Sequence, residues 1–128
     1  MLEIDDIRAG NQVLHNVSGS IATILKVDGN KILLETFPQN SYVSNDDICG
    51  IPLTDSLLKK LSFTNTEQTD TWTGEGLNIR AKDDGFFYGL RNFKSKAKMQ
   101  YLHQLQNYVT DFYALFREKQ HALDVSML

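Results

Sequence analysis

The strongest helical signal in this chain is a stripe of apolar residues near its C-terminal end. The stripe recurs at steps of three and four residues and consists of Leu102, Leu105, Val109, Phe112 and Phe116. That spacing places the side chains on one face of a helix, so it predicts an amphipathic helix over residues 101–119. Earlier in the chain, apolar residues come in short segments separated by turn residues. One long helix after many short strands predicts an α+β protein.

Turn signals divide the first fifty residues into short strands. Glycine and asparagine tolerate a positive φ, and they mark turns at Gly10-Asn11, Ser18-Gly19 and Asp28-Gly29-Asn30. β-branched residues between these turns favour strands over 12–17, 20–27 and 31–37. Pro38 interrupts the third strand, and Tyr42-Val43 is predicted as a short edge strand. Together they predict a small SH3-like barrel or a curved antiparallel sheet, with a plain meander as the alternative.

The middle of the chain predicts a short helix and a second antiparallel sheet. Thr54 is placed to cap a helix over 55–61. We expect a loop over 62–71, followed by strands over 72–76, 77–82 and 86–91; residues 92–100 are either a further strand or a basic loop. The C-terminal helix is expected to pack on this sheet, and residues 122–128 to fray. The predicted organisation is a β subdomain over 1–50 and an α+β subdomain over 51–128, packed as one unit.

Composition narrows the class of protein. With 128 residues, of which 41% are hydrophobic and 23% charged, the chain has the size and composition of one globular domain. No apolar run approaches the roughly 18 residues that span a bilayer, and the first residues lack the basic and apolar regions of a signal peptide. We therefore expect a cytoplasmic protein without a membrane partner. Cys49 is the single cysteine, which excludes a disulfide or a cysteine-based zinc site within one chain.

Charge is unevenly distributed. The net charge is −3, which disfavours binding to bulk duplex DNA, since duplex binders are usually basic overall. Between Asp84 and Asp111, however, no acidic residue occurs. The basic residues in that gap, with a local net charge of +4, are Arg91, Lys94, Lys96 and Lys98. Such a cluster attracts phosphates or an acidic partner, and the alternative interpretation is a solvated lysine-rich loop.

The start of the predicted C-terminal helix carries polar residues on one face. His103, Gln106 and Asn107 have i, i+3 and i+4 spacing, and their imidazole and amide groups both donate and accept hydrogen bonds. This face suits a polar ligand such as a nucleobase, a ribose or a peptide backbone; alternatively, it bonds to strand edges or water. Aromatic residues available for stacking are Trp72, Phe86, Phe87, Tyr88 and Tyr101. The predicted ligand-binding residues are Trp72, Arg80, Tyr88, Arg91, Lys94, Lys96, Lys98, Tyr101, His103, Gln106 and Asn107.

No catalytic or metal-binding pattern stands out. The histidines His15, His103 and His121 lie far apart, and His103 has no histidine or carboxylate at i+3 or i+4. No serine lies in a Gly-x-Ser-x-Gly motif, and the adjacent carboxylate pairs fall in predicted turns. We therefore predict a protein that is not an enzyme and uses no metal or cofactor.

Three segments resemble a family of short uncharacterised proteins carried by phages and prophages of gut bacteria. They are residues 7–11, residues 51–54 with Leu57-Leu58 and Phe63, and residues 101–108, which read Tyr-Leu-His-Gln-Leu-Gln-Asn-Tyr. The family helix usually continues with a stretch like Tyr-Phe-Ala-Leu, whereas this chain has extra residues before Ala114-Leu115. The resemblance implies an accessory protein of the host cytoplasm. It implies no particular activity and no catalytic residue.

These observations favour a non-enzymatic phage-type protein that sequesters a small nucleotide-derived signal of host antiviral defence. The partner would then be a phosphorylated nucleotide-like molecule. The alternatives are an adaptor that binds a host or phage protein, a single-strand nucleic-acid binder, and a small nucleotide hydrolase. A homo-oligomer is compatible with each hypothesis, because small domains often build binding sites between subunits.

Overall fold

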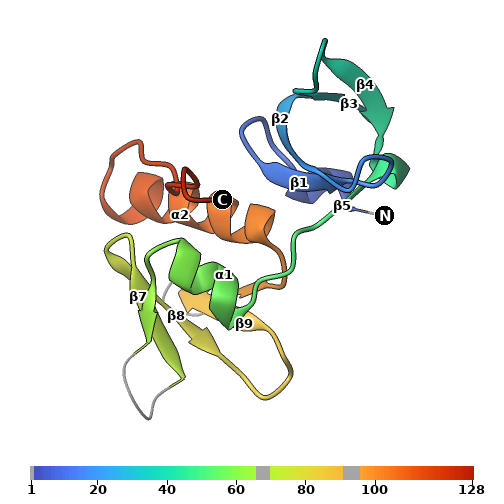
Figure 1. Cartoon of the computed structure of the whole chain (residues 1–128). Coiled ribbons are helices and arrows are strands. Elements are labelled where there is room, and N and C mark those ends of the chain that lie inside the picture. The colour runs from blue at the N-terminus through green and yellow to red at the C-terminus, as the bar shows by residue number, and fades with distance from the viewer. Residues whose placement is uncertain (1, 66–69, 91–95) are drawn as a thin grey trace. The chain divides into compact units, whose positions relative to one another are not determined.

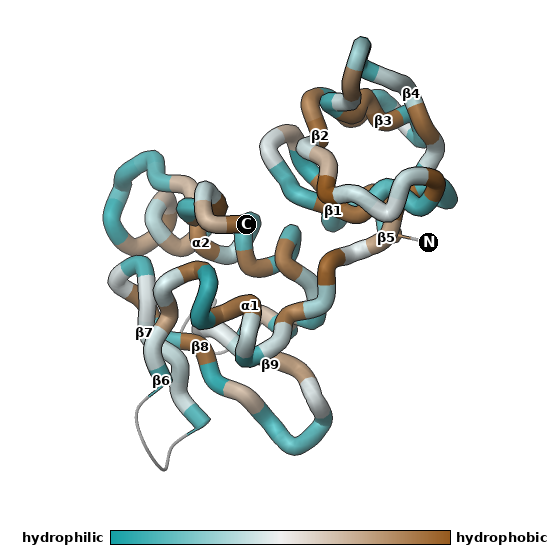
Figure 2. The backbone as a smooth tube through the Cα atoms, viewed as in Figure 1, coloured by the Kyte–Doolittle hydropathy of each residue, from teal (hydrophilic) through white to brown (hydrophobic). Residues whose placement is uncertain are grey.

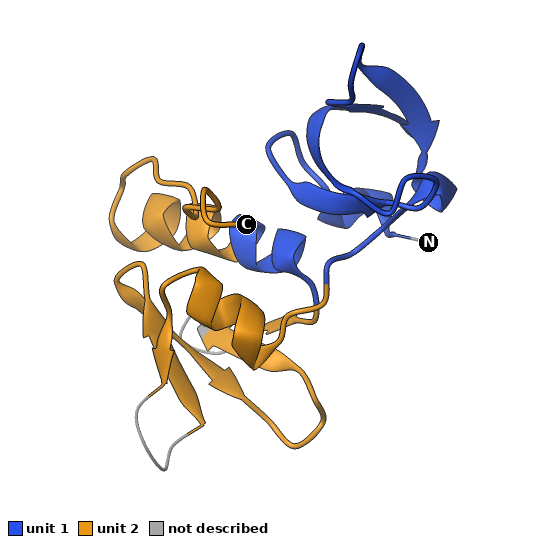
Figure 3. Ribbon diagram, viewed as in Figure 1, with its two compact units in different colours: residues 1–51, 101–107 blue, residues 52–100, 108–128 orange. Residues whose placement is uncertain are grey.

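The computed structural model describes residues 2–65, 70–90 and 96–128. In this part of the chain, two antiparallel sheets are combined with a short helix and a long C-terminal helix (Figure 1), which confirms the predicted α+β class. The chain divides into two compact units (Figure 3): unit 1 comprises residues 1–51 and 101–107, and unit 2 comprises residues 52–100 and 108–128. The first residues of the C-terminal helix thus group with the N-terminal sheet, which the predicted subdomains do not include.

Unit 1 is built around an antiparallel sheet with two flanking 3₁₀ turns. The strands are β1 (Gln12–His15), β2 (Ile21–Asp28), β3 (Lys31–Leu34), β4 (Ser41–Ser44) and β5 (Ile48–Cys49), and the turns are Ile4–Asp6 and Asn45–Asp47. The strands are ordered β4-β3-β2-β1-β5. Because β4 and β5 end this order, a curved open sheet describes unit 1 (Figure 1), and closure into an SH3-like barrel is not required.

The β2–β3 pair shows how local residues produce this curvature. Its register shifts between Ile24 and Lys26, where an extra residue in β2 bends the strand. At the end of the pair, Asp28 lies opposite Lys31, and Gly29 turns the chain with a φ of 61°. Glycine adopts that left-handed conformation without strain, so the predicted hairpin is confirmed.

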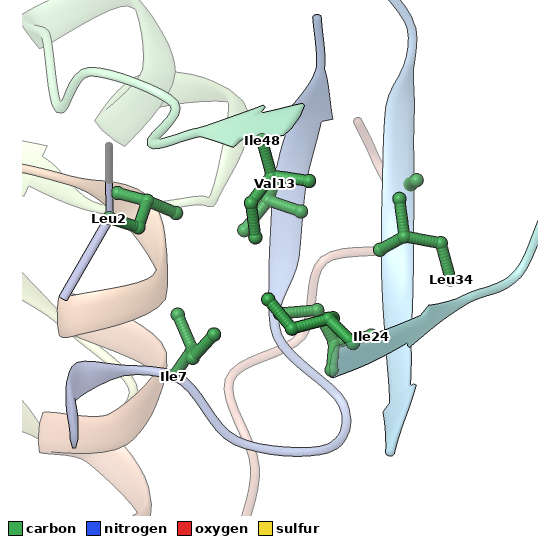
Figure 4. Close-up of a cluster of buried hydrophobic side chains, with 8 residues drawn as sticks. Leu2, Ile7, Val13, Ile24, Leu34 and Ile48 are labelled. Atoms are coloured by element: carbon green, nitrogen blue, oxygen red, sulfur yellow. The ribbon is translucent and has the colours of Figure 1, made fainter. Parts of the chain in front are cut away.

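Alternate residues of these strands form the core of unit 1. On β3, Ile32 and Leu34 are buried, whereas Lys31 is exposed. The buried cluster (Figure 4) consists of Leu2, Ile7, Val13, Ala22, Ile24, Ile32, Leu34 and Ile48. Burying an isoleucine or leucine side chain contributes about 2 kcal/mol, so this cluster is the main stabilising feature of the unit.

Unit 2 contains the short helix and the second sheet. Its elements are α1 (Asp55–Lys60), β6 (Thr64–Asn65), β7 (Thr71–Gly74), β8 (Leu77–Ala81), β9 (Phe87–Leu90) and β10 (Lys96–Met99). Thr54 Oγ1 accepts a hydrogen bond from the backbone N–H of Leu57 at 3.1 Å, which confirms the predicted cap. The antiparallel strands run β10-β9-β8-β7-β6, and hydrophobic and hydrophilic residues alternate along β8 (Figure 2).

Two predictions for unit 2 were refined by the structure. Residues 62–71 were predicted as a loop, but Thr64 and Asn65 pair with Thr73 and Trp72; residues 66–69 lie outside the described part. Of the two interpretations of 92–100, a strand is correct for Lys96–Met99, which pairs with β9.

The C-terminal helix, α2 (Leu102–Phe116), ends three residues earlier than predicted. Glu118 adopts a left-handed φ of 49°, which a right-handed helix cannot continue. The expected fraying of the tail is wrong around Leu123, which is only 5% exposed. Next to it, Glu75 holds the tail, because its carboxylate accepts from Asp124 N at 3.3 Å and contacts His121 Nε2 at 2.6 Å. Neither α1 nor α2 is long and apolar enough to cross a membrane.

Candidate ligand-binding site

Gln106 uses its amide to bind the N-terminal segment within unit 1. Its Oε1 accepts a hydrogen bond from Gln12 N at 2.8 Å, and its Nε2 donates to the carbonyl of Gly10 at 3.2 Å. The side chain is 8% exposed. Both polar ends of the amide therefore bond to backbone groups at the start of β1. This agrees with the alternative interpretation above, in which this helix face bonds to strand edges.

Asn107 acts in the same way one residue later. Its Oδ1 accepts from Asn11 Nδ2 at 2.9 Å, and its Nδ2 donates to the carbonyl of Asp6 at 2.6 Å. Asn11 is itself buried and also accepts from the backbone N–H of Arg8 at 2.7 Å. The amide face of α2 thus anchors residues 6–12, and this use of its hydrogen bonds is structural.

His103 and Tyr101 pack together inside unit 1. Their rings are stacked, with centroids 5.7 Å apart, and His103 is 1% exposed. The Tyr101 ring lies directly against Gly50, where any side chain would collide with it. Burial lowers the pKa of His103, and the Asp6 carboxylate opposes that shift. A neutral, enclosed imidazole is poorly placed to contact a ligand from solvent.

The remaining predicted residues belong to unit 2, apart from two whose positions are not described. Arg91 and Lys94 lie outside the described residues. Trp72 is 4% exposed and points into the core of unit 2, so its ring is unavailable for stacking on a ligand. The others lie on the opposite, solvent-facing side of the sheet: Arg80, Tyr88, Lys96 and Lys98.

Strand alternation brings these residues together. On β10, Ala97 and Met99 are buried, which leaves Lys96 and Lys98 on the outer face. Tyr88 on β9 lies opposite Arg80 on β8 and opposite Lys98 on β10. Directly opposed side chains in an antiparallel sheet have Cβ atoms about 5 Å apart. A tyrosine is therefore flanked by a cation on each side.

Two further residues complete this surface: Phe86, which is predicted for stacking but is left out of the predicted ligand-binding set, and Lys82, which is in neither set. Lys98 Nζ lies 3.9 Å from the centroid of the Phe86 ring, and Lys82 Nζ lies 5.1 Å from that of Tyr88. Both distances are within the range of cation–π attraction. The period-two spacings Arg80/Lys82 and Phe86/Tyr88, on either side of residues 83–85, are the sequence signal for them. We call this set the β9 platform: Arg80, Lys82, Phe86, Tyr88, Lys96 and Lys98.

A depression of about 270 Å³ lies on the platform. It is lined by Arg80, Tyr88 and Lys96, together with Thr71, Asn78, Ile79 and Gly89. Pockets for drug-sized ligands occupy about 300–1,000 Å³, so this depression is smaller than that range and would hold only part of such a ligand. Its polar lining carries positive charge, which suits a phosphate.

Two carboxylates hold the platform residues in place. Asp70 Oδ1 accepts from Arg80 Nε at 3.1 Å, and this contact lowers the pKa of Asp70. Tyr88 Oη donates to Asp84 Oδ2 at 2.5 Å, which lowers the pKa of Asp84 and raises that of Tyr88. The Tyr88 hydroxyl therefore stays protonated at neutral pH and acts as a hydrogen-bond donor.

A larger depression, of about 610 Å³, lies on unit 1 but has a different character. Its lining includes Asp28 and Asp47 and a single cation, Lys31. Asp47 accepts from the backbone N–H of Ser44 at 3.0 Å, as part of a capping box. Its acidic lining makes it a poor match for a phosphate, so the β9 platform is the better candidate site.

Comparison of the chain with protein-family models, with curated proteins and with solved structures finds no match. Among residues 2–65, 70–90 and 96–128, no group of three histidine, cysteine, aspartate or glutamate side chains is placed to hold a metal ion. The geometry of the β9 platform therefore carries the functional argument.

Proposed function

We propose that this protein binds a small phosphorylated, nucleotide-like molecule on the β9 platform and releases it unchanged. The observation that carries the proposal is the register of Arg80, Tyr88 and Lys98 across three strands. An aromatic ring between cations offers a nucleobase a stacking surface and a phosphate a positive counter-charge. Four cations and three nearby carboxylates, Asp70, Asp83 and Asp84, leave this surface with a net charge of +1 in a chain of net charge −3.

Binding without chemical conversion is supported by the side chains around the depression. Its described lining supplies cations, an amide and hydroxyl groups, which bind and orient a ligand. Tyr88, the ionisable hydroxyl among them, has a raised pKa and so is a weak base and nucleophile near neutral pH. In a phage-type accessory protein, such binding would sequester a nucleotide-derived signal of host antiviral defence in the host cytoplasm.

Isothermal titration tests the proposal directly. The purified chain would be titrated with adenosine monophosphate, ADP-ribose derivatives and cyclic oligonucleotides, and we expect saturable heat with at least one of them. Tyr88→Leu should weaken that binding about tenfold, because base–aromatic stacking contributes about 1–3 kcal/mol. Tyr42→Leu is the matched control, since Tyr42 is a 60% exposed strand tyrosine of unit 1. Absence of heat with every ligand at high protein concentration would disprove the proposal.

Chromatography distinguishes sequestration from hydrolysis. After incubation and denaturation of the protein, a sequestered ligand is recovered intact. A nucleotide hydrolase would instead release products that increase with time.

Exposed apolar residues of unit 1 favour a second candidate function, binding to a host or phage protein. Phe37 is 97% exposed and Tyr42 60% exposed, on the segment that leads into and forms β4. Large exposed apolar side chains of this kind mark protein-binding surfaces when they form a patch. Phe37→Ser should abolish capture of a partner from host lysate and leave nucleotide binding unchanged, if this second function is correct.

A further inference from the structure

The β9 platform contains two aromatic rings. Phe86 and Tyr88 are separated by one residue, Phe87, which is buried on the other side of the strand. Lys98 lies opposite Tyr88 in the sheet and at the same time places its Nζ 3.9 Å from the Phe86 ring centroid. One lysine thus approaches both, which puts Phe86 and Tyr88 on the same outer face.

The cations reach these rings from both neighbouring strands. Lys82 follows β8 and lies over Tyr88, whereas Lys98 belongs to β10 and lies over Phe86. Each ring therefore has its own ammonium group, and Arg80 and Lys98 flank Tyr88 within its own row. An ammonium group over a ring covers a surface on which a base would stack. A base that binds there displaces the lysine, which then pairs with a phosphate beside the ring.

The spacing of the rings limits what they can recognise. Residues two apart in a strand are separated by about 6.8 Å, since each residue advances the strand by about 3.4 Å. Successive nucleotides in a stacked helix rise by only about 3.4 Å. Two adjacent bases can therefore occupy both rings only when they are unstacked from each other, as in an extended single strand or a small ring.

We propose that the β9 platform recognises two adjacent bases joined by a phosphodiester, one base on Phe86 and one on Tyr88. This inference rests on the proposed nucleotide-binding function and assigns its ligand class. The linking phosphate would lie among Arg80, Lys82 and Lys98, the cations around the Phe86 and Tyr88 rows, which neutralise it. Linear single strands and cyclic oligonucleotides both contain adjacent bases joined by a phosphodiester. They differ in that a cyclic oligonucleotide has no free 5′ or 3′ end.

The experiment compares ligands that contain one base with ligands that contain two. Binding to the full chain would be measured by titration with adenosine monophosphate, linear diadenylate, cyclic diadenylate, and ten-nucleotide single strands of DNA and of RNA. We expect each two-base ligand that binds to do so at least about tenfold more tightly than the monophosphate, because a second stacked base is added. Whichever of the linear and cyclic two-base ligands binds more tightly identifies the class to which the natural ligand belongs.

Variants separate the contributions of the two rings. Phe86→Leu should remove the advantage of the two-base ligand and leave monophosphate binding within about twofold, whereas Tyr88→Leu should weaken both. Lys98 is exposed, so Lys98→Gln leaves the core intact and should weaken binding of the two-base ligand. Lys26→Gln is the control, because Lys26 is an exposed strand lysine of unit 1, and it should weaken that binding less. Thermal unfolding of each variant verifies that it is folded.

The outcomes distinguish the two proposals. Equal affinity for one-base and two-base ligands, with sensitivity to Tyr88→Leu alone, would overturn the two-base inference and leave the proposed function standing. Binding to none of the ligands would overturn both. Two-base binding that is unaffected by Phe86→Leu and Lys98→Gln would also overturn the inference, because the ligand would then lie elsewhere.

Discussion

Asn11 and Asn107 are joined by a hydrogen bond of 2.9 Å between Asn11 Nδ2 and Asn107 Oδ1, although 96 residues separate them in the chain. Asn11 is 3% exposed, so water cannot replace a lost partner easily. Asn107 also holds the Asp6 carbonyl. This pair, together with Gln106, fixes the first turn of unit 1 to the start of α2.

Replacing Asn107 by leucine should destabilise the protein by about 1–3 kcal/mol, because it leaves a buried amide donor without an acceptor. Urea unfolding would measure this as a lower midpoint with an unchanged slope. Asn40→Leu serves as the control, since Asn40 is exposed and should change the free energy of unfolding by less than about 0.5 kcal/mol. Equal effects of the two substitutions would contradict the structural role of Asn107.

Stability should depend on pH through His103. Its pKa is lowered in the folded protein because burial disfavours the charged imidazolium, so the unfolded chain binds the proton more readily. The free energy of unfolding is therefore highest above the ordinary histidine pKa of about 6.5 and falls as the pH drops below it. The carboxylates with a lowered pKa, such as Asp70 and Asp84, are protonated only below about pH 4. They therefore do not change the stability in the pH range in which His103 is protonated.

His103→Leu tests this pH dependence. Urea midpoints between pH 5 and 8 should fall toward pH 5 in the unmodified protein and become flatter in the variant. His15→Leu, on the partly exposed end of β1, should keep the slope of the unmodified protein. A fall toward pH 5 that persists unchanged in His103→Leu would assign the effect to other groups.

Local signals in the sequence account for most of the fold. Thr54 caps α1 and Gly29 turns the β2–β3 hairpin because both depend on neighbours within three residues. The hydrogen-bond partners of Gln106 and Asn107 could not be predicted from such local signals. Helical spacing shows that their side chains share a face, but their partners at residues 6–12 are about 95 positions away. The same limit applies to the contact between Phe86 and Lys98, because Phe86 directly precedes β9 whereas Lys98 lies on β10.

The C-terminal tail should contribute to stability through Leu123. Leu123→Ala should lower the free energy of unfolding by about 2 kcal/mol, because the side chain is 5% exposed and its removal leaves a cavity. Met127→Ala, four residues later and 71% exposed, should have an effect below about 0.5 kcal/mol. Thermal or urea unfolding measures both effects. If Leu123→Ala left the free energy of unfolding unchanged, the tail would be frayed in solution.

Neutralising Asp70 should strengthen ligand binding at the β9 platform. The Asp70 carboxylate contacts Arg80 Nε at 3.1 Å and reduces the positive charge that a phosphate meets. Asp70→Asn should therefore raise the affinity for a phosphorylated ligand by about two- to fivefold at low salt. The gain should disappear near 1 M salt, where the Debye length falls to about 3 Å. Asp28→Asn, at the end of β2 in unit 1, makes the same charge change at a residue that is not part of the platform and should leave the affinity unchanged. If Asp70→Asn weakens binding instead, Asp70 is needed to orient the Arg80 guanidinium toward the phosphate.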